Sequence, residues 1–457
     1  MRNRLQWLAC LLAAVMVITA CGTADDGGTD DTASDTTAAA ADPTTTVAEA
    51  PEEDTTTTAE ESEEEATTTS TASETEESPT TTAGAEAEGP VGVDGLPEDL
   101  QRLYLEVGET QTAPSAYTDF ESVEGPWEVC YSESFVGNPW RVSLGDEMER
   151  LAAEYEEAGL VSGFTTSVSE SDIARQNQQI RQFSEQDCDI IFAVPGSTTG
   201  LDEAIQAAYD KGIPVVTITG SESPHAQVVD SNYFVMGAEL ATYINENTDG
   251  GVIQVKGIEG APVAVAQNEG AASIWDGSDV NLVAEVNGDW TASVTKQAVL
   301  NALATNPAEV AAVWSTGSET AVIAQAFDES GRDAPLISGS ISGDALGYWN
   351  ENPDGFNFYG VALMPSWTAQ TAWNVGMRIM DGQKPHLQTI MVPIPTVTQD
   401  DMAEMYEECM TPEATSIFPV VPNNPLPPEL MDGYFVGNGV VGPFDYANTP
   451  NPCEAEE

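Results

Sequence analysis

Hydrophobic and polar positions follow two alternating patterns from Trp127 onward. Short, mainly apolar runs such as 190–194 and 213–218 are typical of strands buried on both faces of a sheet. Between such runs lie longer stretches with helical spacing of apolar residues, and several of them end at a glycine, for example Gly159 and Gly212. Strands that alternate with helices in this way predict a parallel sheet covered by helices.

The pattern divides into two α/β units. In the first unit, strands are predicted at 127–134, 164–168, 189–194 and 213–219, and helices at 139–158, 171–184 and 201–211. The rhythm starts again after Asp230, with helices at 234–245, 263–275, 292–305 and 319–329 and strands at 252–256, 282–286, 310–314 and 336–341. The segment 356–363 is predicted to be a strand that returns toward the first unit, where a helix at 366–380 follows.

The predicted fold class is therefore α/β, with two Rossmann-like lobes joined by a hinge of several strands. The N-terminal lobe comprises 101–232 and 364–395, and the C-terminal lobe comprises 233–363. A proline-rich C-terminal extension follows from 396 to 457. Ligands of open α/β sheets bind beyond the carboxyl ends of the strands, so the loops at these ends should face a cleft between the lobes.

The N-terminus carries a targeting signal. Arg2 and Arg4 precede an apolar run over residues 5–20, which suits a signal peptide and is short for a membrane span of about 20 residues. The residues around Cys21 resemble a bacterial lipobox, which implies cleavage of residues 1–20 and attachment of lipid to the Cys21 thiol. The alternative is an ordinary secretory signal with an incidental cysteine.

Charge and composition identify the next segment as a tether. The 457 residues carry a formal charge of −63, and the stretch between Gly22 and Leu100 contains no Lys or Arg. Its Thr-, Glu- and Asp-rich composition cannot bury enough apolar surface to offset chain entropy, so 21–100 is predicted to be a disordered acidic spacer. A binding role for the acidic run is the alternative. Nucleic acid is excluded as a partner because no cluster of Lys and Arg exists to contact phosphates.

The six cysteines indicate which disulfides and metal sites the protein can form. Cys10 leaves with the signal, and Cys21 takes the lipid, so the remaining cysteines reach an oxidising compartment in which disulfides form. Cys409 and Cys453 bracket the proline-rich segment and are predicted to form a disulfide, with free buried thiols as the alternative. The pairing of Cys130 and Cys188 stays open. None of these cysteines has the spacing of a zinc site.

Part of the chain resembles a known family. The segments 131–141, 188–197, 212–219, 288–290 and 298–314, together with the helix end at 326–332, are similar to those of the type I periplasmic sugar-binding proteins, the ribose-like receptors of ABC importers. The resemblance covers about 125–391. It implies capture of a sugar-like solute, delivery to ABC permease subunits, and a monomer anchored by lipid on the outer face of the cytoplasmic membrane. Neither catalysis nor a cofactor or metal is implied.

The resemblance also implies a set of ligand-binding residues: Asn138, Trp140, Arg141, Ser197, Thr219, Asp230, Gln267, Asn268, Trp290 and Ser340. Three positions depart from the ribose-like pattern. An aspartate-arginine pair is replaced by Thr219-Gly220, an arginine by Gln267 or Asn268, and an acidic residue by Ser340. The identity of the sugar therefore does not carry over. Arg141 stands where ribose-type members have an aromatic residue, so it supplies a charged donor instead.

The residue types suit a carbohydrate, because Trp140 and Trp290 can stack on the apolar face of a pyranose while Arg141 donates to its hydroxyls. The alternatives are core packing for the tryptophans, a surface cap for Arg141 and a turn role for Asn138. For the other polar candidates the alternative is a solvated loop or a helix cap.

Two other functions are considered. One is a ligand-sensing lipoprotein of the same fold that acts in signalling, and the other is an extracellular glycosidase or esterase. The enzyme alternative lacks support, since the two histidines, His225 and His386, have no neighbouring residues spaced for a metal site or a catalytic triad.

Overall fold

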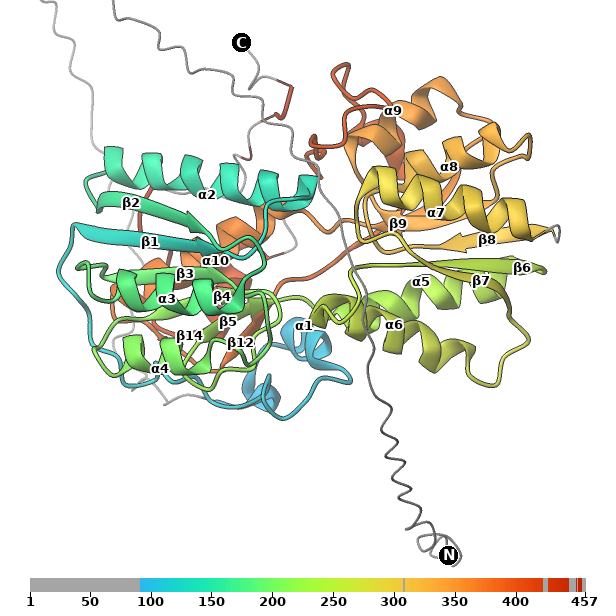
Figure 1. Ribbon diagram of the computed structural model, residues 1–457. Coiled ribbons are helices and arrows are strands. Elements are labelled where there is room, and N and C mark those ends of the chain that lie inside the picture. The colour runs from blue at the N-terminus through green and yellow to red at the C-terminus, as the bar shows by residue number, and fades with distance from the viewer. Residues whose placement is uncertain (1–90, 307–308, 422–425, 444–448, 450, 454–457) are drawn as a thin grey trace, which may run out of the picture. The chain divides into compact units, whose positions relative to one another are not determined.

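The computed structural model describes residues 91–306, 309–421, 426–443, 449 and 451–453 (Figure 1). The predicted signal peptide 1–20, the lipidation site Cys21 and most of the predicted tether lie outside the described residues. Within the described ranges, no helix is both long and apolar enough to cross a membrane.

The first lobe is built on a parallel sheet in the order β12-β5-β4-β3-β1-β2. The strands are β1 (Trp127–Glu133), β2 (Val161–Val168), β3 (Ile190–Val194), β4 (Val215–Ile218), β5 (Gln227–Asp230) and β12 (Thr389–Met391). One face is covered by α2 (Pro139–Glu157) and α10 (Pro365–Met380), and the other by α3 (Ile173–Phe183) and α4 (Asp202–Tyr209) (Figure 1).

Strand β3 shows why this sheet is buried on both sides. Ile190, Phe192 and Val194 belong to the core under α2 and α10, while Ile191 and Ala193 belong to the core under α3 and α4. Successive side chains of a strand point to opposite faces, so an uninterrupted apolar run serves both cores. The ring of Phe192 stacks on Trp373 of α10 with 5.2 Å between the centroids.

The second lobe has a sheet in the order β13-β10-β9-β8-β6-β7. Its strands are β6 (Gly251–Lys256), β7 (Asn281–Asn287), β8 (Val310–Trp314), β9 (Leu336–Ser340), β10 (Asn357–Val361) and β13 (Thr396–Thr398), the last of which is antiparallel to β10. On one face lie α5 (Tyr233–Asn247) and α6 (Pro262–Trp275), and on the other α7 (Ala292–Thr305), α8 (Thr320–Glu329) and α9 (Gly343–Glu351).

Helices α5 and α6 pack with their backbones in contact because glycine occupies both sides of the crossing. A Cβ at Gly237 would lie 2.1 Å from the carbonyl oxygen of Gln267, and a Cβ at Gly270 would lie 2.0 Å from that of Phe234. Any larger residue at either position would force the helices apart. This close backbone contact fixes the position of Gln267 on α6 relative to α5.

One prediction about chain connectivity needs correction. The segment predicted to return toward the first lobe is β10, which pairs instead with β9 and β13 in the second sheet. The chain returns through α10. The connections between the sheets are 231–232, 362–364 and 392–395, and they form the hinge of several segments that the sequence predicts.

The boundary of the predicted tether is also wrong, because folded structure begins earlier. Residues 91–100 include most of α1 (Glu98–Gln101), and Leu96 and Leu100 are buried in the first-lobe core. Tyr104 packs edge-on against Tyr434 with ring centroids 6.5 Å apart. The apolar spacing of Leu96, Leu100 and Tyr104 is that of a helical face, although the surrounding composition is acidic.

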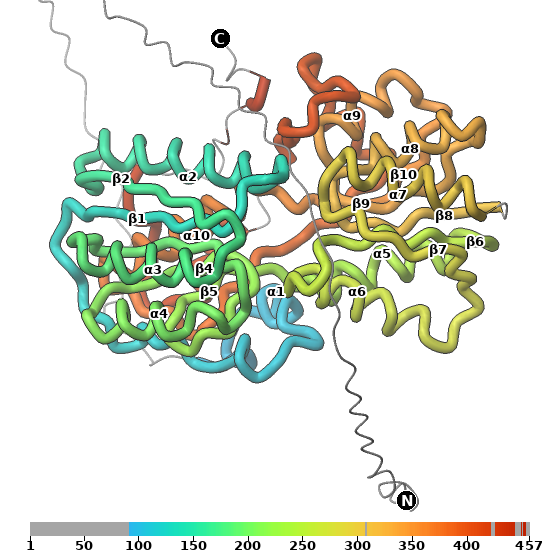
Figure 2. The backbone as a smooth tube through the Cα atoms, in the orientation of Figure 1, coloured from blue at the N-terminus to red at the C-terminus, as the bar shows by residue number. Residues whose placement is uncertain are grey.

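The predicted extension 396–457 is not a separate appendage. Its first residues form β13, and Met402, Met405, Met410 and Phe418 complete the second-lobe core. Farther along, Met431, Tyr434 and Phe435 belong to the first-lobe core. Its short elements are α11 (Met402–Met405), α12 (Pro428–Met431) and β14 (Phe435–Val436), which pairs with β11 (Lys384–Pro385). In Figure 2 the red trace of this segment lies beside α9.

Two disulfides are present among the described residues. Cys409 pairs with Cys453, the pair expected from the sequence. Cys130 of β1 pairs with Cys188, which lies just before β3, in the core under α3 and α4. The sequence alone left this second pairing open, since adjacency of the two strands depends on the sheet order.

Candidate ligand-binding site

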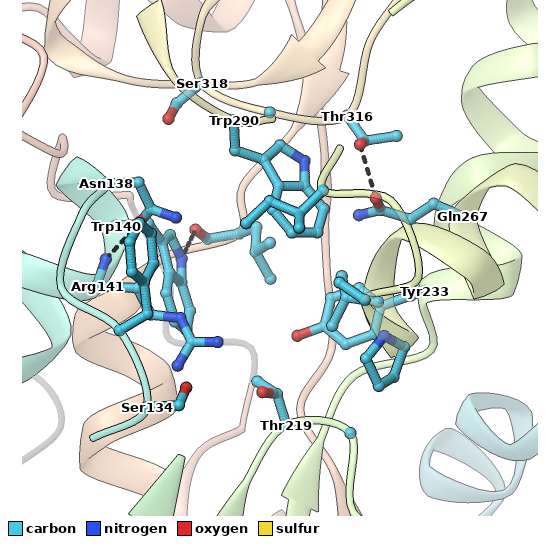
Figure 3. Close-up of a pocket in the computed structure, with 18 of the residues that line it drawn as sticks. Ser134, Asn138, Trp140, Arg141, Thr219, Tyr233, Gln267, Trp290, Thr316 and Ser318 are labelled. Carbon is cyan, nitrogen blue, oxygen red and sulfur yellow. Dashed lines mark hydrogen bonds between the residues drawn. The ribbon is translucent and has the colours of Figure 1, made fainter. Parts of the chain in front are cut away.

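A cavity of about 320 Å³ lies between the two lobes (Figure 3). First-lobe residues reach it from the loops after β1, β3 and β4, and second-lobe residues from those after β6, β7, β8 and β10. Its size is at the lower end of the range for small-molecule sites, about 300–1,000 Å³. The position beyond the carboxyl ends of the strands is the one expected for an open α/β sheet.

Seven of the ten candidate residues line this cavity: Asn138, Trp140, Arg141, Thr219, Gln267, Trp290 and Ser340. Asn138 and Pro139 start α2, because the Asn138 side-chain oxygen accepts a hydrogen bond of 2.9 Å from the backbone N–H of Arg141. Asn138 is thus both a helix cap and a lining residue. The cap puts Trp140 and Arg141 in the first helical turn, from which they face the cavity (Figure 3).

The side chain of Trp140 packs against both lobes. It contacts the first-lobe core and the α7–α9 side of the second-lobe core. Its Nε1 donates a hydrogen bond of 3.0 Å to the carbonyl oxygen of Leu363, in the connection 362–364. The ring is therefore held at the boundary between the lobes.

Arg141 is paired with a carboxylate that the sequence interpretation missed. Its Nη1 donates to Oε1 of Glu133 at 2.8 Å, and Glu133 is only 2 % exposed. Glu133 also accepts from the hydroxyl of Tyr131 at 2.6 Å and from the backbone N–H of Phe135 at 3.1 Å. The pair is electrically balanced, and the other N–H groups of the guanidinium stay available to a ligand.

Trp290 is presented by an unusual turn. Asp289 and Trp290 both have left-handed backbone angles, with φ of 53° and 49°. The indole lies against the backbone at Gly257, where a Cβ would be 2.2 Å from its Cε2, and against Gly317, where a Cβ would be 2.8 Å from its Cδ1. Two consecutive non-glycine residues in this region store strain, which is typical of a functional turn.

The polar candidates of the second lobe are largely paired within the protein. Gln267 is 2 % exposed and accepts a hydrogen bond of 2.7 Å from the hydroxyl of Thr316, another lining residue that the sequence interpretation missed (Figure 3). Ser340 is 3 % exposed, and its hydroxyl oxygen has no hydrogen-bond partner among the described residues.

Three candidates do not line the cavity, and their assignment is corrected. Ser197 accepts from the backbone N–H of Gly200 at 3.1 Å, and Asn268 accepts from the side-chain nitrogen of Gln254 at 3.2 Å. Asp230 accepts from the backbone N–H of Gly220 at 2.9 Å and lines an adjoining cavity of about 460 Å³. Burial raises the pKa of Asp230 to about 6. Each of the three fulfils a local capping or pairing role.

Glu319 is a further lining residue that the sequence interpretation missed. It directly precedes α8 and is 5 % exposed. Burial, and to a lesser extent the neighbouring charge of Asp344, raises the pKa of Glu319 to about 8. Asp344 is fully buried, which raises its pKa to about 7 although Ser342 donates a 2.6 Å hydrogen bond to it. Acidic residues are so common here that composition could not single out these two.

With this fold and site, the chain belongs to the periplasmic binding protein family, whose domain matches residues 130–384. The ribose import binding protein of Bacillus subtilis is 25 % identical over 272 residues, which cover 59 % of this chain and 86 % of that protein.

Solved structures share the two-lobed type I fold. An ABC transporter solute binding protein from Thermobispora bispora has a TM-score of 0.55 at 24 % identity and covers 61 % of this chain and 87 % of its own. One from Bacillus halodurans with bound myo-inositol has a TM-score of 0.54 at 20 % identity, covering 62 % and 98 %. At these identities the likeness concerns the fold.

Proposed function

We propose that this protein is an extracytoplasmic substrate-binding lipoprotein that captures a sugar or sugar-like solute between its lobes and delivers it to an ABC importer. The observation that carries the proposal is the cavity lined by both lobes, with Trp140 and Arg141 on one side and Trp290 on the other. Relatives named for ribose import or crystallised with myo-inositol support a polyhydroxylated ligand.

The chemistry of the lining fits such a ligand. Two indole faces cover the apolar C–H surface of a ring, while Arg141, Asn138 and Thr219 offer polar groups to its hydroxyls. Because the Arg141–Glu133 pair is balanced, these donors bind a neutral hydroxyl without a buried net charge. The site needs no catalytic group, and we propose that the protein turns nothing over.

Ligand contacts with both lobes favour the arrangement in which the lobes enclose the solute. The connections 231–232, 362–364 and 392–395 are the hinge about which this closure occurs. The closed form is then the one that a membrane permease recognises. Ser231 in the first connection donates a 3.0 Å hydrogen bond to the carbonyl oxygen of Val392 in the third, so we propose that these two connections move together.

The location is proposed from the sequence of residues 1–100. Signal removal, lipid on Cys21 and an acidic spacer would hold a monomeric domain outside the cytoplasmic membrane. Disulfides at Cys130–Cys188 and Cys409–Cys453 agree with an oxidising compartment. Labelling with a radioactive fatty acid, compared between the natural chain and Cys21→Ala, tests the anchor.

The function is tested by thermal unfolding of the folded chain with a panel of sugars, polyols and nucleosides. A ligand that binds only the native state stabilises it by RT ln(1 + L/Kd), where L is the free ligand concentration, about 2.7 kcal/mol at 100 times Kd, and so raises Tm. At least one sugar or polyol should raise Tm. A panel without any effect would contradict the proposal. If a ligand is found but deletion of the gene leaves its uptake intact, the protein acts in signalling instead.

A further inference from the structure

The charges that line the cavity do not balance. Arg141 is its one cationic lining residue in the described chain, and it is already paired with Glu133 at 2.8 Å. Glu259 and Glu319 also line the cavity, the first exposed at the rim and the second buried. Burial without a neighbouring cation favours the protonated form of the Glu319 carboxyl group, and a cation that arrives with a ligand would allow it to ionise.

The position of Glu319 suits such a partner. Its Oε2 would lie 2.0 Å from a Cβ at Gly317, and Cδ1 of Trp290 would lie 2.8 Å from the same point. The carboxyl group is therefore next to the edge of the Trp290 indole. In the part of the chain that the structure describes, no other residue donates a hydrogen bond to this carboxyl group.

Ser340, at the end of β9, gives an independent sign that the cavity awaits a polar ligand. Its hydroxyl oxygen is buried without a hydrogen-bond partner among the described residues, and the residue lines the same cavity as Glu319. Native proteins leave few buried polar groups without a hydrogen bond. An unpaired hydroxyl that lines a binding cavity therefore indicates that a polar group of the ligand bonds to it.

The charged residues that line the adjoining cavity of about 460 Å³ are also acidic. Its ionisable carboxylates are Glu106, Glu222, Asp230 and Glu269, and no Lys or Arg lines it. It shares lining residues with the first cavity, among them Tyr233 and Gly260. A cleft lined by one sign of charge raises the local concentration of ligands of the opposite sign.

We propose that the solute carries a positive charge: it is an amino sugar or a similar hydroxylated amine, whose ammonium group binds Glu319 beside Trp290. This inference rests on the proposed function and names the substrate class of the same site. The ammonium pairs with the Glu319 carboxylate once the carboxyl proton has left, while the hydroxyls bind toward Arg141 and Asn138.

Proton coupling follows from the environment of Glu319. Its raised pKa means that the empty site holds a proton at neutral pH. An arriving ammonium group displaces this proton to the buffer, while the amine keeps its own proton. The titratable groups on the helices packed against α8 are Asp344, Tyr348 and Glu351 of α9 and Lys296 of α7. Lys296 pairs with Glu329 and Tyr348 with Asp328, both in the last turn of α8.

The experiment is isothermal titration of the folded chain with matched pairs of ligands: glucosamine, galactosamine and mannosamine against glucose, galactose and mannose. We expect at least one amino sugar to bind about tenfold or more tightly than its parent sugar at pH 7. Titration at pH 7 in two buffers of different ionisation enthalpy should show release of a fraction of a proton on binding of the amino sugar.

The matched variants are Glu319→Gln in the cavity and Glu246→Gln on α5, an exposed carboxylate that lines neither cavity. Glu319→Gln should abolish both the preference for the amine and the proton release, and Glu246→Gln should keep both within about twofold. Circular dichroism confirms that each variant is folded. Equal or better binding of the neutral sugars by the natural chain overturns the inference and leaves the proposed function standing. Absence of binding in both series overturns the inference, and the wider thermal-unfolding panel then decides the proposed function separately.

Discussion

The indole nitrogen of Trp140 and the carbonyl oxygen of Leu363 are joined by a hydrogen bond of 3.0 Å. Trp140 belongs to the first turn of α2 in the first lobe, whereas Leu363 follows β10 of the second lobe. The side chain proposed to stack on the ligand therefore also links the lobes. Ligand affinity and the energetics of lobe movement should both respond to changes at this position.

Two substitutions at Trp140 separate these roles. Trp140→Phe keeps an aromatic face and loses the hydrogen bond to Leu363, which forms without a ligand, so the free energy of unfolding should fall by about 1 kcal/mol while Kd changes less than about threefold. Trp140→Ala removes the ring, and truncation of a central aromatic contact costs at least about 2 kcal/mol, so Kd should rise about 30-fold or more. Titration calorimetry with the ligand found in the panel measures both Kd values, and urea denaturation measures the free energy of unfolding. Equal affinity of Trp140→Ala and the natural chain would show that the ring does not contact the ligand.

Arg141 and Glu133 should behave as a coupled pair. Arg141→Ala leaves a buried carboxylate without its cation, which should lower the free energy of unfolding by about 3 kcal/mol. Glu133→Gln in the same chain should recover most of that stability, because the uncompensated charge is gone. Ligand binding should stay weak in the double variant, since the guanidinium donors are missing. Urea denaturation and calorimetry check the two parts separately, and recovered binding would remove Arg141 from the site.

Most of the fold follows from the hydrophobic pattern, because parallel strands buried on two faces must be apolar throughout. The runs predicted at 189–194 and 213–219 contain β3 and β4. Strand β13 escaped prediction, since Thr396–Thr398 is short, has a single buried residue and depends on β10 for its pairing. The region 91–100 was misassigned because the acidic residues around Leu96 and Leu100 dominate its composition.

The site was predictable where the family resemblance marks a segment. It implied the residues around the Asn-Pro pair at 138–139, and the structure gives the physical reason: Asn138 caps α2, so Trp140 and Arg141 in its first turn line the cleft. The side chains of Ser197 and Asn268 point toward their hydrogen-bond partners in the protein and not into the cavity. Which partner lies within reach depends on the folded backbone, so the sequence could not predict it. Glu133 and Glu319 were missed because burial distinguishes them from the other acidic residues, and burial is a tertiary property.

Buried carboxyl groups make stability depend on pH. The pKa is raised to about 8 for Glu319 and about 7 for Asp344, and burial is the main cause for both. Since the folded state holds these protons more tightly than the unfolded chain, the contribution is fully present below about pH 4 and is lost as pH rises to about 8. Tm of the ligand-free protein should therefore fall by several degrees between pH 5 and pH 8.

The general self-repulsion of an acidic chain acts in the same direction, so variants are needed to isolate this effect. Glu319→Gln should flatten the fall in Tm, while Glu259→Gln, at an exposed position of the same cavity, should leave its slope almost unchanged. Scanning calorimetry at constant ionic strength is the measurement. Identical slopes for the two variants would show that Glu319 ionises normally.

The C-terminal segment supplies a carboxylate, that of Asp432, which pairs with a buried guanidinium of the first lobe. Arg378 of α10 is fully buried and bonds to Asp432 at 2.6 Å, to Asn374 at 2.7 Å and to Gln383 at 3.2 Å. Asp432→Asn should cost about 2 kcal/mol or more, because a buried guanidinium loses its counter-charge. Chemical denaturation checks the value. Asp381→Asn, one residue beyond the end of α10, is the matched control and should have almost no effect.

The two ends of the described chain meet in one core, where Leu100 and Tyr104 pack with Tyr434 and Phe435. Leu100 and Tyr104 are synthesised early, whereas Tyr434 and Phe435 are synthesised almost last. The second lobe lacks only β13 and the short stretch up to Phe418 when β10 has been made. During translation and export, the lobe that is made later should therefore reach its native packing first, and the earlier one should wait for the final residues.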